Sequence, residues 1–135
     1  MKEAYVTFET AKLLKENGFD WDCLGFFKYY KSSPHAKPRL EMNISIYPSV
    51  RENSVASCPT QQMACRWLRE EKGIHIMPTI GCDVDRTPRI FYSAVIALFN
   101  DYGDIDYRDP LDENGYNEPE DAIEAALKYC LTNLI

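Results

Sequence analysis

The segment 59–76, PTQQMACRWLREEKGIHI, constrains the fold more than any other part of the chain. Thr60 is suited to cap a helix, because its hydroxyl can accept a hydrogen bond from a free backbone N–H of the first turn. Apolar residues then recur at helical spacing through Trp67 and Leu68. Gly73 can adopt the left-handed conformation that ends a helix, which lets Ile74 fold back onto Leu68. The pattern predicts an amphipathic helix that leads at once into a strand.

Three patterned segments precede this helix. Residues 7–17 predict a short amphipathic helix, because a threonine opens them, apolar residues recur at helical spacing and an Asn-Gly pair closes them. Residues 23–31 are rich in aromatic side chains, which favour strands, and residues 40–47 alternate between apolar and polar side chains. These two strands predict a β-hairpin, and the polar, aperiodic residues 48–57 predict a connector to the helix.

Two strands are predicted after the helix. Residues 74–80 alternate, and Pro78 places this strand at an edge of its sheet or ends its pairing early, because proline has no N–H to donate. A turn at 81–88 leads to residues 89–100, whose two faces are both apolar. A strand of this kind is typical of the centre of a sheet that is covered on both sides.

The chain closes with an acidic loop and a helix. The loop, 101–117, is dense in Asp, Gly and Asn, and its residues 104–107 can form a short strand that continues the hairpin. Its acidic residues do not match the spacing of an EF-hand calcium loop, so we expect a solvated loop. The segment EPEDAIEAALKYCLTNLI then predicts a helix with Pro119 at its first position and a continuous apolar stripe.

The order α-β-β-α-β-β-α predicts an α+β fold, in which a mostly antiparallel sheet packs against helices. A length of 135 residues is typical of one domain, so we expect residues 1–135 to form a single α+β domain. Hydrophobic residues make up 45% of the chain and aromatic residues 13%, which argues against a disordered chain. No apolar run approaches the roughly 20 residues that span a bilayer, and no secretory signal is recognised, so we expect no membrane contact.

Five cysteines stand at irregular spacing, and they form none of the C-x-x-C pairs typical of a zinc site. We therefore expect free thiols in a reducing cytoplasm, with no metal and no cofactor. The sharpest catalytic candidate is Cys58, at the start of the central helix, with His75 as its base. Because the sequence places no oxyanion site beside them, we assign no catalytic residue and expect no enzyme. A small cysteine-dependent enzyme stays an alternative.

Two groups of side chains are candidates for binding. One is an aromatic and basic run at 26–31, which begins with Phe26 and Phe27. Its proposed binding residues are Lys28, Tyr29, Tyr30 and Lys31. Aromatic rings can stack on bases while lysines neutralise phosphates, so this run predicts single-stranded nucleic acid as an alternative partner. The other group is Arg66 and Arg69, on the polar face of the central helix, which could contact phosphate or an acidic partner.

The charge distribution argues against nucleic acid as the main partner. The net charge is −6, and residues 81–135 carry four Lys or Arg against twelve Asp or Glu. Nucleic-acid-binding surfaces instead rest on clustered Lys and Arg. The nine tyrosines are suited to protein interfaces. We therefore expect a non-enzymatic binding protein that acts through protein–protein contacts, with a protein partner or with a second copy of itself.

Three stretches carry a resemblance: YVTFETAKLLKENGF, CPTQQMACRWLREEKGIHI and EDAIEAALKYCLTNLI. They resemble a group of small uncharacterised proteins that are common in Bacteroides and related bacteria and in their phages and mobile elements. The resemblance covers about half of the chain, and residues 32–57 and 101–117 do not contribute to it. It implies an accessory protein of phage or mobile-element type in the cytoplasm, and it brings no catalytic residues.

Overall fold

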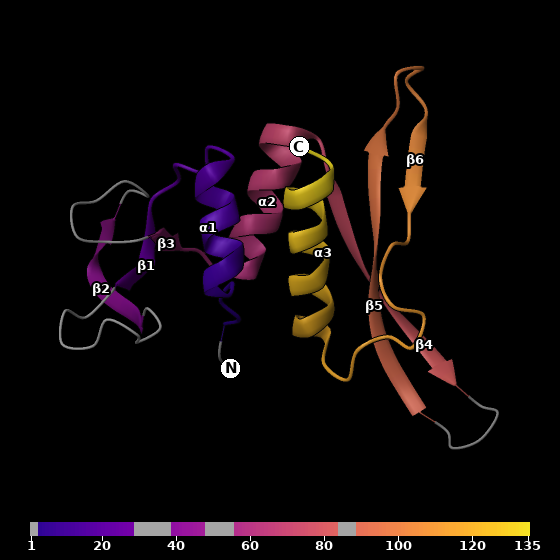
Figure 1. The fold of residues 1–135 in the computed structure, drawn as a ribbon, viewed down its shortest axis with the longest axis horizontal. Coiled ribbons are helices and arrows are strands. Elements are labelled where there is room, and N and C mark those ends of the chain that lie inside the picture. The colour runs from indigo at the N-terminus through magenta and orange to yellow at the C-terminus, as the bar shows by residue number, and fades with distance from the viewer. Residues whose placement is uncertain (1–2, 29–38, 48–55, 84–88) are drawn as a thin grey trace. The chain divides into compact units, whose positions relative to one another are not determined.

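The computed structural model describes residues 3–28, 39–47, 56–83 and 89–135 (Figure 1). Its elements in chain order are α1 (Phe8–Glu16), β1 (Cys23–Lys28), β2 (Arg39–Tyr47), β3 (Ala56–Cys58), α2 (Gln61–Lys72), β4 (His75–Asp83), β5 (Arg89–Phe99), β6 (Ile105–Arg108) and α3 (Pro119–Asn133). Helices and antiparallel strands are combined as predicted, which confirms the α+β class. The strands β3 and β6 add to the order predicted from the sequence.

The chain divides into two compact units, Met1–Ala64 and Cys65–Ile135, and the division falls within α2. Each unit contains one three-stranded antiparallel sheet, with strand orders β2-β1-β3 and β4-β5-β6. That the two units together form one domain stays a prediction.

The first unit contains the predicted hairpin. Strands β1 and β2 pair antiparallel from Lys28↔Arg39 to Cys23↔Tyr47, with a register shift between Cys23 and Gly25. Strand β3 pairs with the other edge of β1, so the expectation that residues 48–57 form only a connector is wrong from residue 56 onward. Three small buried residues form this strand, and so short a segment has no period that the sequence could display.

Helix α1 begins and ends as predicted. The Thr7 hydroxyl accepts from the Thr10 N–H at 3.4 Å, and Gly18, just past the C-cap, has a φ of +93°. The helix packs against β3 and buries Ala11 and Leu14. Its first residue, Phe8, meets Phe27 of β1 edge to face, with ring centroids 5.3 Å apart. Phe27 is therefore a core residue of the first unit.

Helix α2 begins and ends at the residues predicted to cap it. The Thr60 hydroxyl accepts from the Met63 N–H at 3.1 Å. At the other end Gly73 has a φ of +67°, and the Ile74 N–H donates to the Leu68 carbonyl at 3.2 Å. Ile74 and Leu68 are both buried. These bonds satisfy backbone groups that the ends of a helix otherwise leave unpaired.

The second unit is built around β5, which pairs with β4 on one side and β6 on the other. This confirms that β5 is central and that β4 is an edge strand. Pairing continues past Pro78↔Ala94 to Asp83↔Arg89, so the turn predicted at 81–88 is wrong for residues 81–83, and residues 84–88 lie outside the described part. Residues 81–83 continue β4 because β5 is long enough to pair with them, and this pairing prevails over the local preference of these residues for a turn. The short strand predicted at 104–107 is present as β6, one residue later in the chain, at Ile105–Arg108.

Helix α3 packs against β4 and β5 (Figure 1). Its buried residues confirm the predicted apolar stripe, and they are Ala122, Ala126, Leu127, Cys130 and Leu131. On β5 the fully buried residues Ala94 and Ile96 lie on one face of the sheet, since side chains two apart point the same way. Helix α3 covers this face. The prediction that β5 is covered on both faces is wrong at Phe99, which is 67% exposed.

A loop, rather than a helix, lies beside the first half of β5, at the opposite end from Phe99. Tyr116 forms an isolated bridge with Tyr92 of β5, and each N–H donates to the other carbonyl at 2.8 Å. Phe91 lies against Gly81 and Gly115, and a Cβ atom on either glycine would overlap its ring. Phe91 is thus held by two glycine backbones.

Candidate binding groove on the open sheet face

The register of the second sheet defines the face that α3 leaves uncovered. His75 pairs with Ala97, Ala97 pairs with Tyr107, and Phe99 pairs with Ile105. Directly opposed residues of an antiparallel sheet share a face. We call this surface the open face. In the half of the sheet that contains β6, its members are His75, Met77, Val95, Ala97, Phe99, Ile105 and Tyr107.

Large apolar side chains on the open face are accessible to solvent. Phe99 is 67% exposed, Tyr107 66%, Ile105 51% and Met77 38%. A single exposed apolar residue is normal in any protein, but four that share one sheet face form a continuous patch. Such patches mark interaction sites or grooves for ligands.

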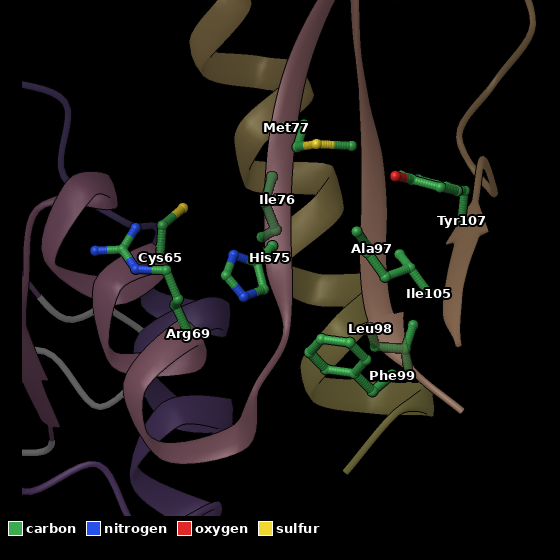
Figure 2. A pocket seen from close by; sticks show the side chains of 10 residues that line it. All are labelled: Cys65, Arg69, His75, Ile76, Met77, Ala97, Leu98, Phe99, Ile105 and Tyr107. Atoms are coloured by element: carbon green, nitrogen blue, oxygen red, sulfur yellow. The ribbon is translucent and has the colours of Figure 1, made fainter. Parts of the chain in front are cut away.

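A groove with a volume of about 450 Å³ lies on this face (Figure 2). Helix α2, the three strands and their side chains line it: Cys65, Arg69, His75, Ile76, Met77, Ala97, Leu98, Phe99, Ile105 and Tyr107. Most of the lining is apolar, and polar groups are few, as in most binding sites. Arg69 and His75 supply polar groups at the side formed by α2, and the Tyr107 hydroxyl supplies one on β6 (Figure 2).

Burial keeps the groove thiol protonated. Desolvation raises the pKa of Cys65 to about 11, although the Arg69 guanidinium acts in the opposite direction. Desolvation likewise raises the pKa of Cys130 on α3 to about 12, and Cys65 adds to this rise. A thiol must lose its proton to act as a nucleophile. At neutral pH Cys65 therefore lines the groove as a small, uncharged side chain.

The two arginines predicted as binding residues have different surroundings. Arg66 donates from Nε to Glu70 Oε1 at 2.9 Å, across one turn of α2. Arg69 lines the groove and forms no ion pair with the described residues. Exposed pairs such as Arg66–Glu70 contribute little stability. Arg69 is thus the cation that a bound group in the groove would meet.

The aromatic and basic run falls mostly outside the described residues. Lys28 is the last residue of β1, in the first unit, whereas Arg66 and Arg69 belong to the second. Tyr29, Tyr30 and Lys31 lie outside the described part. Within β1 itself, Phe27 is buried against Phe8, so it is not available for stacking on bases. Binding of nucleic acid to this run stays a hypothesis.

The cysteine and histidine proposed as an enzyme pair have unlike environments. Cys58 is fully buried in β3 of the first unit, and its thiol donates to the Val6 carbonyl at 3.4 Å. His75 is exposed at the start of β4 in the second unit and lines the groove. A substrate cannot reach the Cys58 sulfur in this state, so the structure gives no support to nucleophilic catalysis by Cys58.

The open face was not among the sequence predictions, although one signal pointed to it. Residues 89–100 carry apolar side chains on both faces. The sequence predicts one helix after this strand, and one helix can cover only one face of a sheet. The other face therefore needs a different segment to cover it. The loop containing Gly115 covers part of Phe91, and α3 covers Ala94 and Ile96. Phe99 has neither cover.

No family model, curated protein or solved structure matches the chain. In the described residues no group of three or more His, Cys, Asp or Glu side chains could hold a metal ion. Within the same ranges no helix is long and apolar enough to cross a bilayer.

Proposed function

We propose that this chain is a non-enzymatic binding protein, and that its contact surface for a protein partner is the open face of the β4-β5-β6 sheet. The observation that carries the proposal is the exposure of Phe99, Tyr107, Ile105 and Met77 on one sheet face. Aromatic residues and Met are enriched in the buried centres of protein interfaces. Removing these four side chains from water would stabilise a complex.

The partner we infer is a protein segment that carries apolar side chains and one carboxylate. The apolar side chains would lie over Phe99 and Ile105, and the carboxylate would meet Arg69, which forms no ion pair with the residues described. Guanidinium groups bind carboxylates through paired hydrogen bonds. A protein segment suits this surface better than a small molecule, because the exposed patch continues to the edge strand β6 and small-molecule sites enclose most of their ligand.

The cellular setting is part of the proposal. All five cysteines are free thiols, which supports a reducing compartment such as the cytoplasm. The resemblance to proteins of Bacteroides phages and mobile elements supports an accessory role, in which the chain binds a protein of the host or of the element. Binding through the open face requires no cofactor.

The experiment compares capture of partners by three purified forms of the protein from cells that carry it. These are the wild type, Phe99→Asp and Ile80→Asp. Ile80 is the matched control, because it is 73% exposed but lies on the opposite face of β4. We expect a defined protein to be recovered by the wild type and by Ile80→Asp, and its recovery by Phe99→Asp to fall at least tenfold.

Arg69→Gln tests the inferred carboxylate. Once the recovered protein has been purified, Arg69→Gln should raise the Kd of its complex with the chain about tenfold. This change corresponds to the loss of a hydrogen bond to a charged group. Equal recovery by the wild type and Phe99→Asp would show that the open face is not the contact surface. An unchanged Kd for Arg69→Gln would refute the inferred carboxylate alone.

A further inference from the structure

The outer edge of β6 has a charge pattern that complements itself. We propose that two copies of this chain associate through antiparallel pairing of their β6 strands, centred on Tyr107, so that Asp106 of each copy faces Arg108 of the other. The proposal goes beyond binding by the open face, because it concerns the edge of the sheet and a second copy of the chain. It needs no other partner.

The free hydrogen-bonding groups of β6 follow from its pairing with β5. The Asn100 N–H donates to the Asp104 carbonyl at 2.8 Å, which makes 100↔104 a hydrogen-bonded pair. Such pairs alternate along an antiparallel ladder, so Leu98↔Asp106 is also hydrogen-bonded. The backbone groups of Ile105 and Tyr107 therefore point away from β5. Among the described residues β6 pairs with β5 alone, which leaves this edge open.

Geometry allows few registers for two such edges. A two-fold axis perpendicular to the sheet keeps each side chain on its own face, so opposed residues must belong to the same face. Near the middle of β6 this permits Asp106 opposite Asp106, or Tyr107 opposite Tyr107. The first register places like charges directly opposite each other, which is destabilising. The second places Asp106 opposite Arg108 twice, in non-hydrogen-bonded pairs, where side chains approach most closely.

Edge strands usually carry charges that prevent pairing with other chains. Charges of one sign would have this effect on β6. Here Asp106 and Arg108 have opposite signs and lie two residues apart on one face, so the same charges attract in the register centred on Tyr107. Asn100 Nδ2 lies 3.5 Å from Asp106 Oδ1. No ion pair within the described residues occupies Arg108.

The apolar side of β6 agrees with this register. Tyr107, 66% exposed, would meet Tyr107 of the second copy, and aromatic cross-strand pairs stabilise sheets. Because the axis is perpendicular to the sheet, the two open faces would lie on the same side of one six-stranded sheet. The dimer would then present two binding grooves in one direction.

The test is sedimentation velocity of the full chain over a range of concentrations. We expect the wild type to form a dimer. Asp106→Arg places arginines opposite each other and Arg108→Asp places aspartates opposite each other, so each variant alone should dimerise at least tenfold more weakly. An equimolar mixture of the two variants restores both opposite-charge pairs, and we expect it to form a heterodimer. Asp101→Arg, with the same charge change outside β6, should dimerise like the wild type.

The mixture also controls for folding, because unfolded variants would not recover dimerisation on mixing. A wild type that stays monomeric at all concentrations would overturn the proposal. So would single variants that dimerise like the wild type, or a mixture that remains monomeric while the wild type dimerises. None of these outcomes would affect binding of a partner to the open face of a single chain.

Discussion

At the residue scale, the five thiols differ in access to solvent. Cys23, Cys58 and Cys130 are buried, Cys65 is partly buried, and Cys82 on β4 is exposed. Burial raises the pKa of Cys65 to about 11 and that of Cys130 to about 12. A raised pKa keeps a thiol protonated until the pH approaches that value. These groups are therefore unreactive near neutral pH for two reasons, access and protonation.

We predict that only Cys82 reacts promptly with a disulfide reagent such as DTNB at pH 8 in the native protein. The other thiols should react at least about 100-fold more slowly, because they are buried or protonated. Stopped-flow absorbance should show one fast equivalent, and Cys82→Ser should remove it. A fast phase that survives in Cys82→Ser and disappears on further substitution of Cys58 would revive the cysteine-enzyme alternative.

The proposed contact surface could not be located from the sequence, and two phenylalanines show why. Phe91 and Phe99 stand on the same face of the same strand, and the alternation that predicts β5 treats them alike. Phe91 is half-buried, because its ring lies against Gly81, which faces it across the β4–β5 pair, and against Gly115 of a loop far along the chain. Phe99 meets no such segment in the described part of the chain and is 67% exposed. The difference depends on contacts between distant segments, which a local pattern does not contain.

At the element scale, predictability follows the range of the interactions. Helix α2 could be predicted to within a residue or two, because Thr60 and Gly73 set its ends through bonds to near neighbours. The strands β3 and β6 are short and form only by pairing with longer strands. Their own sequences therefore carry a weak signal or none.

We predict that Trp67→Ala lowers the free energy of unfolding by about 3–5 kcal/mol, because Trp67 is buried on α2 and its loss leaves a large cavity. Trp21→Ala is the matched control, since Trp21 is only partly buried beside Phe19, and its loss should be smaller. Urea denaturation followed by circular dichroism measures both. A loss below about 1 kcal/mol for Trp67→Ala would show that this side chain is not part of the core.

At the scale of the whole molecule, the second unit has more apolar sheet surface than helix to cover it. Helix α3 packs on one face of the β4-β5-β6 sheet, and the loop that contains Gly115 lies against Phe91 at one end of the other face. The rest of that face is the open face, with its groove and Arg69 (Figure 2). Arg69 was predicted as a binding residue from its helix face, but its apolar neighbours come from three strands, whose register no single segment specifies.

We propose that the open face of one folded chain binds apolar groups that carry an anion, with Arg69 as the cation. The most direct test is a fluorescence titration with 8-anilinonaphthalene-1-sulfonate, a dye with an apolar body and one sulfonate. We expect saturable binding to the wild type and to the opposite-face control Ile80→Asp, and at least tenfold weaker binding to Phe99→Asp, with both variants folded like the wild type by circular dichroism. Equal binding of the dye by the wild type and Phe99→Asp, or no binding by the wild type, would show that the open face is not a binding surface.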